Sequence, residues 1–221
     1  MTSELLFTGP ELCKFEAHEV VALLKAREIS SSDLIDAALT RIAQTGPLIN
    51  ATPTLCEARA RAVDLSSRDS TPAGWLAGLP ITIKDLNAVA DVRTTFGTKG
   101  LAGFIPQKSD PLVDQLEQRG AVILGKTNTP EFGAGGNTFN DVFGQTRNPW
   151  NTALNPGGSS GGAAASLAAG EIWLSHGSDH GGSLRTPAAY CGIVGLRPSP
   201  GVAGGPGQDT AFIIEGVQGP M

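Results

Sequence analysis

The sequence lacks the features that mark several common classes of protein. Its three cysteines, Cys13, Cys56 and Cys191, are odd in number and widely spaced. This pattern excludes a disulfide framework and a C-x-x-C zinc site, and it is typical of a reducing compartment. No run of about 18 apolar residues occurs, and no basic segment with an apolar core follows the first residue. We therefore expect a cytoplasmic protein that has no membrane partner.

Basic residues are also too few and too scattered to form a nucleic-acid surface. The formal net charge is −5, with 16 lysines and arginines among 221 residues. Because phosphate binding needs such residues gathered on one face, we expect no nucleic-acid partner. Apolar residues make up 40% of the chain, which is enough to bury a core, and the length favours one large domain over two.

Apolar periodicity predicts helices in alternation with strands. Ser30 is expected to cap the second helix, and Gly46 with Pro47 to end it. The predicted helices cover residues 16–27, 30–46, 54–66 and 110–120, and the predicted strands cover 81–83, 121–124 and 172–174. Such alternation indicates an α/β fold with a buried sheet.

Glycine is abundant, and two glycine-rich stretches contain serines. The first is GGSSGGAAASLAAG at 157–170, and the second, GSDHGGSLR, covers 177–185. Glycines remove every Cβ around these serines, so the backbone can turn sharply and approach a ligand. The alanines at 163–169 predict a helix whose first free N–H groups point back at the serines and favour negative charge. We therefore expect the chemistry of the chain to lie in these two stretches.

These two stretches, with ITIKD at 81–85, resemble the signature motifs of the amidase signature family in type, order and spacing. The resemblance runs from about residue 16 to residue 221. It implies a mixed sheet flanked by helices on both faces. Since members of the family continue well beyond this length and the tail shows no closing element, we interpret the chain as the N-terminal portion of one such domain, incomplete at its C-terminus. A helical cover would occupy about 1–70 and a catalytic core about 75–200.

The proposed catalytic residues are Lys84, Ser159 and Ser183. A serine hydroxyl is a poor nucleophile at neutral pH and needs a base, and a lysine can be that base only when it is uncharged. Burial at the end of a strand would favour the uncharged amine. The resemblance implies the roles: Ser183 is the nucleophile that forms the acyl-enzyme, Ser159 is a bridging serine with a cis peptide bond, and Lys84 is the general base.

An oxyanion hole is expected at the second glycine-rich stretch. It would consist of the backbone N–H groups of His180, Gly181, Gly182 and Ser183, because glycines next to a nucleophile allow several amides to converge on one point. His180 stands where the family commonly has Thr, Leu or Ile, and a plain substitution explains it better than a role in the pocket. The resemblance implies that the neighbouring Asp179 and Arg185 brace the loop without taking part in catalysis.

Three other motifs occur and are rejected on context. The run from Gly120 to Thr127 fits G-x-x-x-x-G-K-[ST], but its inner residues are apolar strand formers and not a phosphate cradle. The run 157–161 fits G-x-S-x-G, whose mechanism needs an acid and then a histidine further downstream. His176 and His180 have the H-x-x-x-H spacing of a zinc site but lack its helix and its glutamate.

The sequence thus predicts an enzyme that hydrolyses a carboxylic amide of a small molecule to an acid and ammonia or an amine. No metal and no cofactor are expected, and a homodimer stays open. The segment 131–137 is expected to line the acyl pocket, with simple turn chemistry as an equal alternative. Two further functions stay open: a component of the glutamyl-tRNA amidotransferase A type, and a non-catalytic fragment or half that needs a complementing C-terminal segment.

Overall fold

The computed structural model describes residues 8–66, 73–203 and 216–221. The α-helices are α1 (Ala17–Ala26), α2 (Ser31–Ile49), α3 (Glu57–Arg61), α4 (Pro111–Gln118), α5 (Gly161–Ala168) and α6 (Arg185–Cys191). Three short 3-10 helices are η1 (Glu11–Lys14), η2 (Lys99–Leu101) and η3 (Glu131–Gly133). The strands are β1 (Thr54–Leu55), β2 (Pro80–Lys84), β3 (Val122–Thr127), β4 (Phe139–Asn140), β5 (Gly144–Gln145), β6 (His176–Asp179) and β7 (Val217–Pro220).

The central strands form mixed layers of parallel and antiparallel pairs. Strand β3 pairs in parallel with β2 and antiparallel with β1. On the other side of β2, a parallel bridge joins Thr82 to Ser175, and β6 continues from there and pairs antiparallel with β7. Strands β2 and β3 are buried throughout, as their continuous apolar character predicts. Their parallel alignment means that their carboxyl ends lie at one edge.

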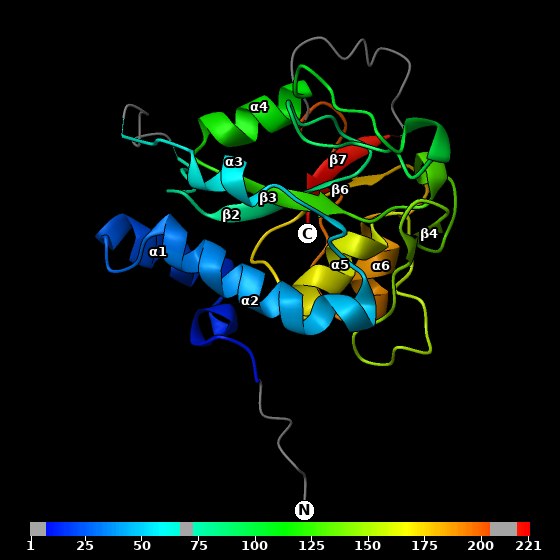
Figure 1. The fold of residues 1–221 in the computed structure, drawn as a ribbon, viewed down its shortest axis with the longest axis horizontal. Coiled ribbons are helices and arrows are strands. Elements are labelled where there is room, and N and C mark those ends of the chain that lie inside the picture. Colours follow the sequence, from blue (N-terminus) through cyan, green and yellow to red (C-terminus); the bar gives the residue numbers. More distant parts are fainter. Residues whose placement is uncertain (1–7, 67–72, 204–215) are drawn as a thin grey trace, which may run out of the picture.

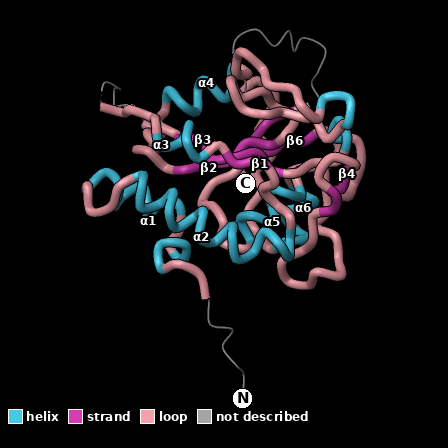
Figure 2. Tube along the Cα trace, in the orientation of Figure 1, coloured by secondary structure: helices cyan, strands magenta, loops and turns pink. Residues whose placement is uncertain are grey.

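Helices cover both faces of these strands, which confirms the predicted fold class. Helix α4 lies on one side, and α2, α5 and α6 lie on the other (Figures 1 and 2). The main core lies between α2 and the strands; Leu34 and Ile35 of α2 pack there with Ile81, Ile83 and Ile123, all of them buried. Helix α2 begins as its sequence predicts, because Ser30 and Asp33 form a reciprocal capping box.

Two predicted boundaries are wrong. Helix α2 continues through Pro47 and ends only at Asn50, which adopts a left-handed conformation with φ 51°. The extra turn buries Ile49 against Ala51, Ala165 and Ala169, and this contact offsets the helix hydrogen bond that a proline cannot form. The helix predicted over 54–66 is replaced by strand β1 and the short helix α3.

Residues 172–174 do not form the predicted strand. Ile172 and Trp173 are buried in the main core, and the indole of Trp173 donates to the carbonyl of Leu12 at 3.1 Å. Side chains that pack on one shared core do not alternate between two faces, so the strand begins only at His176. The expectation that the tail has no closing element is also wrong, because β7 pairs with β6 over its full length.

The described residues include no helix that is both long enough and apolar enough to cross a membrane.

Candidate active site

The candidate site lies where the carboxyl ends of β2 and β6 meet. Lys84 is the last residue of β2, and Ser178 lies near the end of β6, which runs alongside. Lys84 has no solvent-exposed surface, although its strand neighbours are apolar. An unpaired ammonium at such a place would be costly. The side chain must therefore find its partners inside the protein.

Lys84 finds three hydroxyl groups. Its Nζ atom lies 2.7 Å from Ser159 Oγ, 2.9 Å from Ser160 Oγ and 3.0 Å from Ser178 Oγ. An uncharged amine has two N–H donors and one lone pair, so it can donate to two of these hydroxyls and accept a proton from the third. The three contacts therefore fit an amine that acts as a base.

The electrostatic environment also favours the uncharged form of Lys84. Burial lowers the pKa of Lys84 from 10.5 to about 7, while the negative charge of Asp179 limits this fall. Near neutral pH a large fraction of the molecules would thus hold a free amine at Lys84. This is the state that the sequence prediction requires of a general base.

Close packing of the backbone places Ser159 and Ser160 against the amine. The peptide bond between Gly158 and Ser159 is cis, as expected. Ser160 precedes helix α5, and the first two residues of that helix are glycines for steric reasons. A Cβ on Gly161 would lie 2.3 Å from Thr138 Oγ1, and one on Gly162 would lie 2.4 Å from the backbone nitrogen of Asn128. Only glycine allows α5 to approach these neighbours so closely.

The loop that contains Ser183 is wrapped around the buried carboxylate of Asp179. The N–H groups of Gly182 and Leu184 donate to Asp179 at 2.9 and 3.1 Å. Arg185 donates to both carboxylate oxygens at 3.0 Å, and Arg197 contacts one of them at 2.9 Å. Although burial raises the pKa of Asp179, the Arg185 bonds and the loop amides hold it well below its ordinary value. Asp179 and Arg185 thus have the bracing geometry that the sequence predicts.

The structure brings Lys84 and Ser159 together, whereas Ser183 stands apart from them in its bonding. Ser183 is half-buried, and its hydroxyl forms no hydrogen bond within the described part of the chain. Of the predicted oxyanion donors, Gly182 directs its N–H to Asp179, and His180 has an exposed side chain. The N–H groups of Gly181 and Ser183 have no acceptor among the described residues.

Sequence reasoning gave no role to two residues that contact the amine, Ser160 and Ser178. Ser160 also bonds to the backbone of Ser178, with 3.3 Å between its Oγ and both the carbonyl oxygen and the nitrogen. The signal for Ser178 was its place at the end of a strand next to Lys84. That signal was not available, because the strand was predicted four residues too early.

The rejected motifs have structural roles in the described residues. Lys126 is buried in β3, and its Nζ binds Asp85 at 3.1 Å, the carbonyl of Asn87 at 2.7 Å and Thr94 at 2.8 Å. All of its donors are engaged, so it does not form a phosphate cradle. His176 is buried, and its Nε2 pairs with Gln218 at 2.8 Å. Burial lowers the pKa of His176 to about 3, so the ring is neutral.

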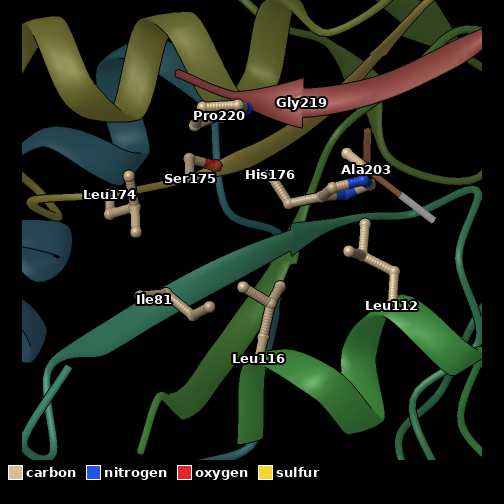
Figure 3. Close-up of a pocket in the computed structure, with 9 residues that line it drawn as sticks. All are labelled: Ile81, Leu112, Leu116, Leu174, Ser175, His176, Ala203, Gly219 and Pro220. Carbon is tan, nitrogen blue, oxygen red and sulfur yellow. The ribbon is translucent and has the colours of Figure 1, made fainter. Parts of the chain in front are cut away.

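An apolar cavity of about 200 Å³ lies on the α4 side of β2 and is separate from the serines. Leu112 and Leu116 of α4 face Ile81 across it, and His176 lies at the opposite wall (Figure 3). The segment 131–137 lies on the other side of the site, beside Ser159. A Cβ added to Gly133 would lie 3.6 Å from Ser159 Oγ. Of these two features, only the segment is close enough to contact a molecule bound at the serines.

Comparison with known proteins gives consistent results. The Amidase family model matches residues 33–221. The A-type component of the glutamyl-tRNA(Gln) amidotransferase from Carboxydothermus hydrogenoformans is 45% identical over 195 residues, which are 86% of this chain and 40% of that protein. The chain thus spans about 40% of the length of this curated relative.

Solved structures agree in fold over nearly the whole chain. A bacterial aryl acylamidase of the amidase signature family matches with a TM-score of 0.84 and 34% identity, over 93% of this chain and 44% of that one. The 6-aminohexanoate cyclic dimer hydrolase matches with a TM-score of 0.83 and 33% identity, over 94% of this chain and 43% of that one.

Proposed function

Because the chain belongs to the amidase signature family, we propose that its serine site cleaves a carboxylic amide to an acid and ammonia or an amine through an acyl-enzyme on Ser183. The observation that supports this best is the 2.7 Å contact between Lys84 Nζ and Ser159 Oγ. A buried amine with a lowered pKa, held against a serine, is a base in need of a nucleophile. The family resemblance assigns that nucleophile to Ser183, 24 residues beyond Ser159 in the chain.

The reaction begins with a proton transfer along two hydroxyls. Ser183 attacks the amide carbonyl, its proton passes to Ser159, and Ser159 passes its own proton to Lys84. The protonated lysine then returns a proton by the same route to the leaving nitrogen, so that the C–N bond breaks and an ester to Ser183 remains. Water attacks this ester in the second half of the reaction and restores Ser183.

The negative charge that develops on the carbonyl oxygen needs N–H donors. Gly181 and Ser183 are the proposed donors, because their N–H groups have no acceptor among the described residues. The N–H of His180 would join them, and Gly182 would do so only if its bond to Asp179 opens. Removing one such donor typically costs about 3–4 kcal/mol of transition-state stabilisation. The segment 131–137 would hold the acyl group, and the proposed core of about 75–200 would contain all three catalytic residues.

Transamidation is the second candidate, since the 45% identical relative is named as part of a glutamyl-tRNA(Gln) amidotransferase. Both reactions start with cleavage of an amide and differ in the molecule that receives the ammonia. The residues after Lys84 resemble the stand-alone amidases more closely, and the net charge of −5 gives weak support to a small-molecule substrate. We therefore propose hydrolysis ahead of transamidation.

Covalent labelling tests the proposal. The 221-residue chain and its S183A and S160A variants are treated with a fluorophosphonate, and mass spectrometry locates the adduct. We expect labelling of Ser183 in the parent chain and in S160A, and none in S183A. An adduct on Ser160 would overturn the assignment. If the folded chain is neither labelled nor active on simple amides, it is a non-catalytic portion that needs a complementing segment.

A further inference from the structure

Glu171 is a fully buried carboxyl group that the proposed reaction does not use. It follows helix α5 and lies between that helix and α2. Its Oε1 lies 2.6 Å from the hydroxyl of Thr45 on α2, and its Oε2 lies 3.0 Å from the hydroxyl of Thr52 just beyond α2. A buried carboxylate held only by two neutral hydroxyls is poorly compensated, which raises the question of where its proton resides.

The hydroxyl of Thr45 answers this question, because it has one proton and two oxygen neighbours. It lies 2.9 Å from the carbonyl of Arg41 as well as 2.6 Å from Glu171. If Thr45 gives its proton to Arg41, a carboxylate at Glu171 would face the Thr45 oxygen with no proton between them. If Thr45 gives it to Glu171, the same gap opens toward Arg41. A proton on Glu171 Oε1 fills both contacts, while Thr52 donates to Oε2.

The surroundings of Glu171 add little compensation for a negative charge. The apolar cluster of Ile49, Ala51, Ala165 and Ala169 packs between α2 and α5 at this point. Arg41 on α2 is the cationic residue whose field reaches Glu171. Its Nε is directed to the carbonyl of Ala169 at 2.7 Å. From the segment after α2, only the uncharged Thr52 contacts the carboxyl group.

We propose that Glu171 is held as an uncharged acid whose proton ties α2 to the end of α5, and that loss of this proton loosens α5 and the serine loop before it. The connection to that loop is short. Thr52 follows Ala51, whose carbonyl accepts from Asn128 at 2.9 Å. The same carbonyl would lie 2.8 Å from a Cβ at Gly162, in the first turn of α5. The carboxyl group thus anchors the segment that sets how closely α5 approaches its neighbours.

The proton would be lost near neutral pH. Burial raises the pKa of Glu171 from 4.5 to about 7, although the two threonine bonds and Arg41 oppose the shift. Since the folded protein keeps the proton longer than the unfolded chain does, Glu171 stabilises the fold fully below about pH 4.5. This contribution is lost as the pH rises toward about 7, by up to about tenfold in the folding equilibrium per pH unit.

Infrared difference spectroscopy on the 221-residue chain tests the inference independently of any activity. The E171Q variant keeps every bond of the cluster, because its amide nitrogen donates to Thr45 and its oxygen accepts from Thr52. The spectrum of the parent minus E171Q should show a protonated carboxyl band at about pH 6 that gives way to a carboxylate band at about pH 8. The control variant is E117Q, which removes a carboxylate paired with Arg59 at 2.8 Å and should remove no protonated band.

Stability measurements provide the second readout. The parent should lose stability relative to E171Q between about pH 5 and pH 7, and E117Q should keep the slope of the parent. No acid band at about pH 6, or a constant difference between parent and E171Q, would overturn the inference. If E171Q does not fold, the 13Cδ resonances of the glutamates in the parent decide. One of them must titrate near pH 7 and shift in T45V, and its absence would overturn the inference equally.

Discussion

Replacing Lys84 with methionine should change the pH dependence of stability in a direction that few substitutions produce. Lys84 is fully buried, and its pKa is lowered from 10.5 to about 7 by that burial. Between these two values the unfolded chain binds more protons than the folded one, so the parent gains stability as the pH rises. K84M has no such group. The difference in unfolding free energy between the two proteins must therefore change with pH.

The magnitude follows from the size of the shift. At about 1.4 kcal/mol per pKa unit, the parent should gain about 4 kcal/mol relative to K84M between about pH 7 and pH 10. The variant also loses the three hydrogen bonds of the amine, at about 1 kcal/mol each, but this loss is the same at every pH. We therefore expect K84M to be about 1–2 kcal/mol more stable than the parent at pH 7 and about 2 kcal/mol less stable at pH 10.

Urea unfolding followed by tryptophan fluorescence measures this difference at each pH. Groups that titrate equally in both proteins cancel, so the crossing of the two stability curves reports Lys84 alone. K84M should at the same time show no labelling by a fluorophosphonate. A free-energy difference that stays constant from pH 7 to pH 10 would refute the reasoning, because Lys84 would then be charged in the folded protein.

Three further predictions concern the same site. Fluorophosphonate labelling of the parent should slow about tenfold for each pH unit below about 7, because only the neutral amine of Lys84 accepts a proton; a flat profile down to pH 5 would contradict this. D179N should lower the unfolding free energy by about 3–5 kcal/mol, measured in urea, since the cations of Arg185 and Arg197 lose a buried partner. G162A should cost about 1–3 kcal/mol, because its methyl group would lie 2.4 Å from a backbone nitrogen; unchanged stability would show that α5 can move.

Local signals in the sequence were sufficient for the elements that follow local rules. The capping box at Ser30 and the proline and aspartate at the start of α4 set helix starts that do not depend on distant contacts. The buried strands were equally clear, since β2 and β3 are apolar at nearly every position. Lys84 could be singled out because a lysine at the end of such a strand conflicts with its surroundings.

The remaining features depend on contacts between distant segments. Pro47 lies within α2 because Ile49 packs on α5, more than 100 residues away. Residues 172–174 were assigned to a strand because apolar runs in a strand and in a core segment look alike. The contact of Ser178 with Lys84 arises from the register between β2 and β6, which no local pattern encodes.

The most direct test of the account is the titration of Lys84 itself. The 15N resonance of its Nζ can be followed by NMR from pH 5 to pH 11 in the folded chain and assigned by its absence in K84M. The account predicts a midpoint at about pH 7, with the neutral amine populated at physiological pH. A resonance that stays that of an ammonium up to about pH 10, the ordinary range for a lysine, would contradict it.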